Sequence, residues 1–129
     1  MSTAIQLDPL EIVLGHNFPV AITATKPSQG AGDRFREVPD TGLSLTAFLS
    51  LARGPTATAI HANVSIALPE IAATAAYYNE FAGANLTAHL TAYADTSTPI
   101  YLVVSDGTTI RASAECRVVS AGQLQVPAG

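Results

Sequence analysis

The chain has 129 residues, of which 48 % are hydrophobic and only 12 % are charged, and its net charge at pH 7 is −4. This length and apolar content predict one globular domain with a sizeable core, not a disordered chain. The acidic balance argues against nucleic acid as the main ligand, because phosphate binding requires a concentrated cationic face. The sequence also lacks the run of about 18 apolar residues that spans a bilayer. We therefore expect a domain that binds neither nucleic acid nor membrane.

The low charge has a second consequence, because much of the surface must consist of alanine, threonine, serine and glycine. Such a surface is easily desolvated and suits burial against partner subunits. A general bias of the source organism toward alanine and threonine explains the same composition equally well. Cys116 is the one cysteine, so no internal disulfide forms, and the first residues do not resemble a secretory signal. These features predict synthesis and folding in the cytoplasm.

The first elements in chain order are two short strands, predicted over Glu11–Leu14 and Val20–Thr25. The residues between them include Gly15-His16-Asn17 and Pro19. Glycine and asparagine favour a turn, and proline favours an edge position because it lacks a backbone N–H.

A long loop is predicted next, over residues 26–42, because residues 26–40 have neither a helical nor a strand period. Loops of this length are usually functional or disordered, and this one is rich in charged side chains. We expect it to contact a partner protein. The candidate contact residues are Lys26, Arg34, Phe35, Arg36 and Glu37.

Alternation of apolar and polar residues then indicates a hairpin. In Leu43–Leu51 the odd positions are apolar and the even ones are polar except Phe48, so a strand there buries one face and exposes the other. Ile60–Leu68 alternates in the same way with its even positions inward. The breakers in Arg53-Gly54-Pro55-Thr56 predict the connecting loop.

The last third of the chain predicts a strand, a short helix and a second hairpin. The strand covers Ala75–Ala82, and the helix covers Asn85–Ala94, where apolar residues recur at i, i+4, i+7 and i+8 and Gly83 or Asn85 begins the helix. Alternating runs over residues 100–104 and 110–119 flank Ser105-Asp106-Gly107. Asp-Gly between such runs is a strong hairpin signal, because glycine tolerates the positive φ of the turn.

About seven short strands separated by turns are typical of an all-β fold, here an immunoglobulin-like β-sandwich with one short helix over about residues 85–94. The cysteine pair and the tryptophan of antibody domains are absent. We expect a single domain over residues 1–129, with its core over about 9–119 and a C-terminal tail over 120–129.

The histidines give no indication of a metal site. His16, His61 and His89 are predicted in a turn, on an outward strand face and on the side of the helix. None forms a pair at i, i+4, and no cysteine or carboxylate cluster accompanies them, so we predict no metal. Cys116 shares a strand face with apolar residues and is predicted to be a buried small hydrophobe.

Catalytic motifs are also missing from the sequence. No phosphate loop, nucleophile elbow or dinucleotide fingerprint occurs. Glu70 and Glu80 are an acid/base pair in principle, but solvated surface charge is the better interpretation. We predict no catalytic residue, no cofactor and no enzymatic activity.

From Thr41 to Val119 the predicted order is a hairpin, a tyrosine-containing strand, a short Leu-Thr-Ala-His-Leu helix and a final Asp-Gly hairpin. In this layout the chain resembles the small immunoglobulin-like domains of tailed-phage particles, including the amino-terminal domains of baseplate upper proteins and head or tail accessory proteins. The resemblance covers roughly the last two thirds of the chain and rests on arrangement and composition, without a diagnostic motif. It implies cytoplasmic synthesis followed by assembly onto a capsid, neck or tail.

We therefore predict a non-enzymatic structural subunit of a tailed-phage virion: a head decoration, a neck or head–tail adaptor, or a tail accessory. Its partners would be other virion proteins or copies of itself, with edge pairing between strands as the natural mode of contact. The alternative is a soluble β-sandwich module that binds a small ligand or carbohydrate. That function requires a concave site with clustered aromatic residues, whereas most of the four Tyr and four Phe are needed for the core.

Overall fold

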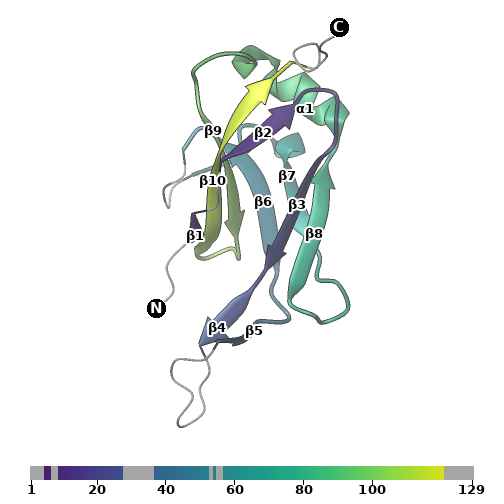
Figure 1. The fold of residues 1–129 in the computed structure, drawn as a ribbon, viewed down its shortest axis with the longest axis vertical. Helices are drawn as coiled ribbons and strands as arrows, with labels where there is room; N and C mark the ends of the chain where they lie inside the picture. The colour runs from purple at the N-terminus through teal and green to yellow at the C-terminus, as the bar shows by residue number, and fades with distance from the viewer. Residues whose placement is uncertain (1–4, 7–8, 28–36, 53, 55–56, 121–129) are drawn as a thin grey trace, which may run out of the picture.

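The computed structural model describes residues 5–6, 9–27, 37–52, 54 and 57–120. Within these residues the protein is mostly β-structure, with one short α-helix and a curled main sheet (Figure 1). No helix in this part of the chain is long and apolar enough to cross a membrane.

The main sheet has six strands in the order β1-β10-β9-β6-β7, and β2 lies along β10 beyond β1. β1 and β2 run parallel to β10, whereas all the other neighbours are antiparallel. The bounds are β1 (Ile5–Gln6), β2 (Leu10–Val13), β6 (Leu45–Ser50), β7 (Ser65–Leu68), β9 (Ile100–Ser105) and β10 (Ile110–Val119).

Four further strands form two small antiparallel pairs. β3 (Phe18–Thr23) pairs with β8 (Ala76–Phe81), and β4 (Thr25–Pro27) pairs with β5 (Glu37–Pro39). The chain curls from β7 toward β8, where Asn79 Nδ2 donates to the Ala67 carbonyl at 2.8 Å. The main sheet and the β3–β8 pair therefore meet at this edge.

The core consists of side chains from the main sheet, from the β3–β8 pair and from the helix. Alternation places one face of each strand inward, so that Leu45, Ala47 and Leu49 of β6 are all buried, as predicted. The largest fully buried side chains are Tyr77, Phe81, Ile12, Leu49, Leu68, Leu86, Leu90, Ile100 and Leu102.

The strand predicted over Ile60–Leu68 is correct only in its second half. A 3-10 turn, η1 (Ala62–Val64), precedes β7, and His61 caps it by accepting the Asn63 N–H on Nδ1 at 3.0 Å. His61 therefore does not lie on an outward strand face. Alternation could not reveal this, because Val64 is buried in the turn as it would be in a strand.

The helix begins at Gly83, one of the two predicted starts, and ends earlier than predicted. α1 spans Gly83–Leu90, and the 3-10 turn η2 (Thr91–Tyr93) follows it. Its first N–H, from Gly83, donates to Asn17 Oδ1 at 2.9 Å, so the cap comes from a distant turn that local sequence does not indicate. A Cβ at Gly83 would lie 2.6 Å from the backbone of Gly15, so only glycine permits this approach.

The predicted loop over residues 26–42 is partly regular structure. Its described residues include β4 and β5, which are too short, with three residues each, to show a strand period. β1 is likewise absent from the prediction. Residues 28–36 and 121–129, which cover the middle of the predicted loop and most of the predicted tail, lie outside the described residues.

Candidate interaction site

The β4–β5 ribbon projects from one end of the body (Figure 1). Lys26 pairs with Val38 at its centre, and the Asp40 N–H continues the ladder by donating to the Ala24 carbonyl at 2.9 Å. Among the described residues, β4 and β5 pair only with each other. An isolated two-stranded ribbon is at best marginally stable in water, so its position depends on the contacts that hold its root.

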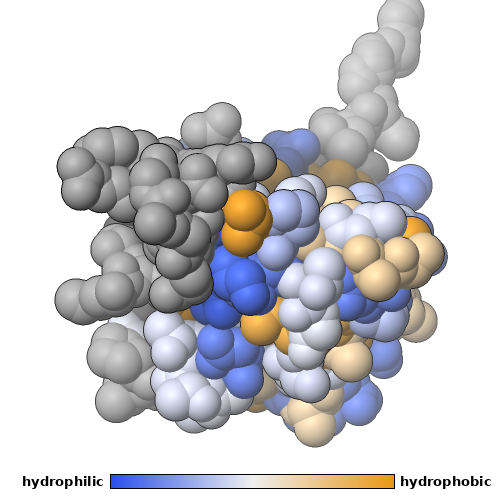
Figure 2. All heavy atoms as spheres, turned by 90° about the horizontal axis from the view of Figure 1, so that it is seen from below, coloured by the Kyte–Doolittle hydropathy of each residue, from blue (hydrophilic) through white to orange (hydrophobic). Residues whose placement is uncertain are grey.

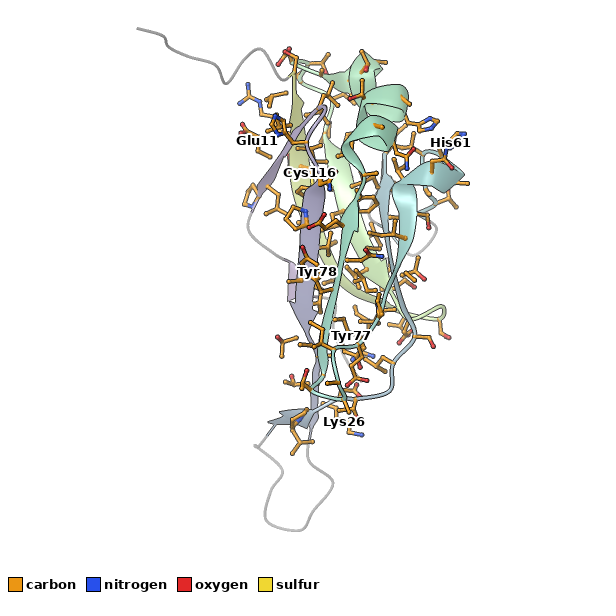
Figure 3. All side chains as sticks on the ribbon, turned by 90° about the vertical axis from the view of Figure 1, so that its right-hand side faces the viewer. Glu11, Lys26, His61, Tyr77, Tyr78 and Cys116 are labelled. Carbon is orange, nitrogen blue, oxygen red and sulfur yellow. The ribbon has the colours of Figure 1, made fainter. Side chains whose placement is uncertain are left out.

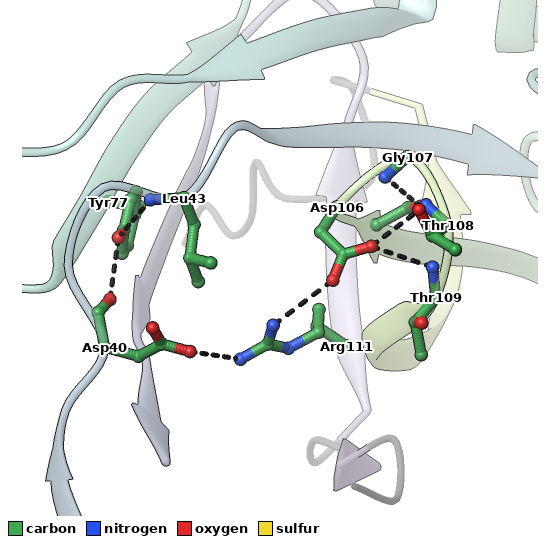
Figure 4. Close-up of polar contacts among 9 residues, drawn as sticks. Asp40, Leu43, Tyr77, Asp106, Gly107, Thr108, Thr109 and Arg111 are labelled. Atoms are coloured by element: carbon green, nitrogen blue, oxygen red, sulfur yellow. Dashed lines mark hydrogen bonds and ion pairs between the residues drawn. The ribbon is translucent and has the colours of Figure 1, made fainter. Parts of the chain in front are cut away.

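Arg111 ties this root to the turn between β9 and β10 (Figure 4). Its Nη2 lies 3.0 Å from Asp40 Oδ2, and its Nη1 lies 3.2 Å from Asp106 Oδ2. The three side chains are 13–21 % exposed, so water screens the attraction less than at an open surface. The hydrogen bond to Asp40, opposed by partial burial and aided by Asp106, raises the pKa of Arg111. The guanidinium therefore remains charged.

Asp106 shapes the turn from which it reaches Arg111. Its Oδ1 accepts the N–H groups of Thr108 at 2.9 Å and Thr109 at 2.8 Å. The bonds from Thr109 and Thr108, with a smaller contribution from Arg111, hold the pKa of Asp106 below its ordinary value. Gly107 follows with φ +94°, which confirms the predicted Asp-Gly hairpin. The aspartate thus has a second role, because it orients Arg111.

Tyr77 provides a buried support for the same root. Its side chain is fully buried, and its hydroxyl donates to the Asp40 carbonyl at 2.8 Å and accepts the Leu43 N–H at 3.1 Å (Figure 4). One side chain thus satisfies two backbone groups of the segment that leads from β5 to β6. Its neighbour Tyr78 points out of the opposite face of β8 and is 38 % exposed (Figure 3).

Glu70 joins the ribbon's root to the loop between β7 and β8. Its Oε1 accepts the Gly42 N–H and its Oε2 accepts the Ala75 N–H, both at 2.8 Å. Glu70 is half-buried and both of its carboxylate oxygens accept backbone N–H groups, so it is less solvated than the free surface charge that the sequence predicts. Backbone donors from two distant segments converge on it, and spacing cannot predict that convergence.

The same expectation is correct for Glu80, which is exposed on the outer face of β8. It accepts the Tyr78 hydroxyl at 2.6 Å and Asn17 Nδ2 at 3.0 Å. The bond from Tyr78, followed by the bond from Asn17, lowers the pKa of Glu80. Glu80 therefore remains an anion on the surface.

The structure places two of the five predicted contact residues on the ribbon. Lys26 is exposed in β4, and Glu37 begins β5 opposite Pro27. The other three, Arg34, Phe35 and Arg36, lie outside the described residues. Of the residues that hold the ribbon, the sequence indicates Asp106 through its turn and Glu70 only as a candidate acid/base residue, and it gives no sign of the contacts that Arg111 and Tyr77 make.

Two histidines that are distant in sequence are in contact. The rings of His61 and His89 are stacked, with centroids 3.7 Å apart and planes 16° from parallel, and Asn63 Nδ2 lies 3.4 Å from His89 Nε2. The stack packs η1 against α1, near the end of the body opposite the ribbon (Figure 3). Parallel rings do not direct their nitrogens at one point. His16 lies in the predicted turn, and the described residues contain no group of three or more His, Cys, Asp or Glu that would hold a metal ion.

Cys116 is 1 % exposed on the inward face of β10, so the prediction of a buried small hydrophobe is confirmed. Burial raises the pKa of its thiol to about 12. The sulfur is therefore a neutral thiol at physiological pH and not a nucleophilic thiolate.

Among the open depressions of the described surface are two that gather no cluster of aromatic side chains. One, of about 390 Å³, lies beside residues 95–99 and 115–117 and has no aromatic lining. The other, of about 360 Å³, has Tyr93 as its one aromatic. Carbohydrate and small-ligand sites generally converge several aromatic and polar groups, and neither of these two depressions shows this convergence.

No known protein-family model matches the chain, and no curated protein matches its sequence. The interpretation of the site therefore rests on its geometry.

Proposed function

We propose that this protein is a non-enzymatic structural subunit of a tailed-phage virion, such as a head decoration, a neck or head–tail adaptor, or a tail accessory. The observation that carries the proposal is the ribbon, a projecting element whose root is fixed by Arg111, Tyr77 and Glu70. Fixing a projecting element before it meets its partner lowers the entropy lost on binding. A ribbon held in this way is suited to docking against another protein.

An immunoglobulin-like sandwich is part of the same proposal. The core cluster joins side chains of β6, β9 and β10 with side chains of β3 and β8, as expected for two sheets that share one interior. The likeness to the small domains of tailed-phage particles rests on this layout. It supports assembly on a particle by analogy of fold.

The strand edges favour contacts through side chains. Pro19 lies within β3, Pro27 within β4 and Pro39 within β5. Proline cannot donate a backbone hydrogen bond to an incoming strand, and proteins use it to protect exposed edges. We therefore propose that the ribbon docks through its faces, in place of the edge pairing expected from the sequence.

The outward face of the β3–β8 pair supports burial in an assembly. It presents the exposed side chains of Pro19, Ala21 and Thr23 beside Tyr78, with Glu80 as its one charge. Small neutral side chains are cheaply desolvated, so such a face is suited to contact with other subunits.

The test is whether the chain is a component of a particle. Tailed-phage particles are purified on a density gradient from a host that carries the gene, and the chain is quantified by mass spectrometry. Immunogold microscopy with antibodies against the purified chain then locates it. We expect a fixed copy number at one place on the particle. Recovery of the chain only in the unassembled fraction would overturn the proposal.

A variant series ties the outcome to the ribbon. Particles assembled with Lys26→Glu or Arg111→Met are expected to carry fewer copies, whereas Ala88→Glu, an exposed change on α1, leaves the copy number unchanged. Equal incorporation of all three variants would show that the ribbon is not the docking element. A chain that is missing from particles and binds a saccharide in a glycan array would instead support the soluble ligand-binding module.

A further inference from the structure

Two exposed aliphatic side chains lie toward opposite ends of the body. Ile71 is 52 % exposed in the loop between β7 and β8, beside the root of the ribbon. Leu51 is 51 % exposed just after β6, on the surface that also holds Tyr93 of η2. η2 directly follows α1, which lies at the end of the body opposite the ribbon (Figure 1). A single exposed aliphatic side chain is normal on a protein surface, so only its surroundings indicate whether it belongs to a contact site.

The loop that carries Ile71 is strained. Ala72, Ala73 and Ala75 have φ values of +49°, +56° and +65°, a left-handed conformation that is unfavourable for alanine. Such conformations persist only where the surroundings enforce them, and they cluster at functional sites. Figure 2 looks onto this end of the molecule, where hydrophobic residues in orange and pale orange reach the surface beside hydrophilic ones.

Hydrogen bonds hold this loop in its strained conformation. The Ile71 N–H donates to the Ala76 carbonyl at 2.7 Å, and Thr74 Oγ1 donates to the Ile71 carbonyl at 2.6 Å. Glu70 binds the Ala75 N–H at 2.8 Å. The loop therefore presents Ile71 in a fixed position on the surface.

The surroundings of Leu51 form an open depression. Leu51 lines the open depression of about 360 Å³, together with Ile60, Tyr93, three alanines, Ser50 and Thr58. The lining residues that the structure describes carry no charge. The Ile60 N–H donates to the Leu49 carbonyl at 2.8 Å, which fixes one wall of the depression against β6. This surface can accept one aliphatic side chain.

We propose that the loop of residues 70–75 in one copy of this protein docks into the depression of a second copy, with Ile71 against Leu51, Ile60 and Tyr93. This inference rests on the proposed function, since it names a second copy as one partner of the subunit. The two surfaces match in chemistry, because the oxygens of Glu70, the loop's one carboxylate, are already bound by backbone N–H groups. A side chain and a depression at opposite ends make the contact head to tail, so repetition builds a ring or a filament.

Sedimentation velocity of the purified full chain over a concentration series tests this contact. Wild-type protein is expected to shift to larger species as concentration rises. Ile71→Asp and Leu51→Asp should each remain monomeric, because either change buries an unpaired charge in the contact. Ala21→Asp, an equally exposed change on the outer face of β3, should associate like wild type. Both positions are exposed, so the far-ultraviolet circular dichroism of all variants should match wild type.

Mixing the two defective variants identifies the geometry. Ile71→Asp keeps an intact depression and Leu51→Asp keeps an intact loop, so an equimolar mixture should form heterodimers and stop there. Wild type that stays monomeric throughout, or a mixture that fails to pair while wild type associates, would overturn the head-to-tail contact. If the chain is then still found in purified particles, only this inference fails. Its absence from particles, with association intact in solution, would overturn only the proposed function.

Discussion

The two ends of the body are held in place by different forces. At the α1 end, Leu86 is fully buried, and Gly83 packs so closely on Gly15 that a side chain would not fit. At the ribbon end, the root depends on the Tyr77 hydroxyl and on the two ion pairs of Arg111. A helix can bury an apolar face, whereas a projecting ribbon has too little surface to bury. Directional polar contacts therefore replace packing where an element must project.

The largest expected effect is at the α1 end. In Gly83→Ala the new Cβ would lie 2.6 Å from the carbonyl carbon and oxygen of Gly15, and backbone atoms cannot rotate away. We expect the free energy of unfolding to fall by about 3 kcal/mol in urea titrations, with an unchanged denaturant slope. Gly54→Ala is the matched control, because no atom lies within 4 Å of its Cβ. Equal stability of the two variants would contradict the close packing of α1.

A smaller loss is expected at the ribbon end from Tyr77→Phe. The change keeps the ring in the core but leaves the Asp40 carbonyl and the Leu43 N–H without their partner, at a cost of about 2 kcal/mol. Urea unfolding measures the loss, and hydrogen exchange should quicken at Leu43. Tyr78→Phe removes an exposed hydroxyl and should change stability little. Slow exchange at Leu43 in the Tyr77→Phe variant would show that the root does not depend on this hydroxyl.

Salt should distinguish the two ends. Arg111→Met keeps the aliphatic stem but leaves Asp40 and Asp106 without their cation, and we expect a loss of about 1–2 kcal/mol at low salt. Because dissolved ions screen the wild-type ion pairs, the loss should shrink at high ionic strength. The loss caused by Gly83→Ala is steric and should not change. A double-mutant cycle of Arg111→Met with Asp40→Asn measures the coupling between these two residues, and zero coupling would contradict a stabilising ion pair between them.

Acid should also act on the ribbon end. The pKa of Asp106 is lowered, mainly by the N–H groups of Thr109 and Thr108. The unfolded pKa of this carboxyl is near the ordinary aspartate value of 3.8. Because its pKa in the folded protein is lower, it contributes stability that is fully present above the unfolded pKa. This stability is lost as the pH falls through the folded pKa. Asp106→Asn keeps the turn's acceptor but not the charge, so about 0.5–1 kcal/mol of this pH dependence should disappear. Urea unfolding of both proteins at pH 7 and below the unfolded pKa measures it, and identical pH profiles would assign the acid sensitivity elsewhere.

Local pattern predicts the strands better than the site. Alternation and Asp-Gly identify β6, β9 and β10 because burial on one face and a positive φ are local requirements. Arg111 and Asp40 form an ion pair although 71 residues separate them, and no local spacing indicates that pair. The stacking of His61 on His89 is also not indicated by the sequence, because the two residues are far apart in the chain. The left-handed conformation of the loop between β7 and β8 could not be predicted, because alanine, unlike glycine, does not favour a positive φ.

The smallest expected effect separates the two ends by its sign. Replacing Ala72, at φ +49°, with glycine relieves a strained conformation, and we expect a gain of about 0.5 kcal/mol after the added chain entropy of glycine is subtracted. The same replacement at Ala88, exposed within α1, should cost about 1 kcal/mol, because helical backbone suits alanine. Thermal unfolding of both variants therefore gives shifts of opposite direction.

Ala73→Gly, at φ +56°, repeats the test within the same loop and should also stabilise the protein. If Ala72→Gly and Ala73→Gly both destabilise it as Ala88→Gly does, the loop is not strained. The fixed presentation of Ile71 would then have no basis in backbone conformation. If instead the loop variants stabilise the protein and Ala88→Gly destabilises it, the strained loop that holds Ile71 lowers the stability of the ribbon end, whereas α1 carries no such strain. Such a cost is expected where a surface is preorganised for a partner.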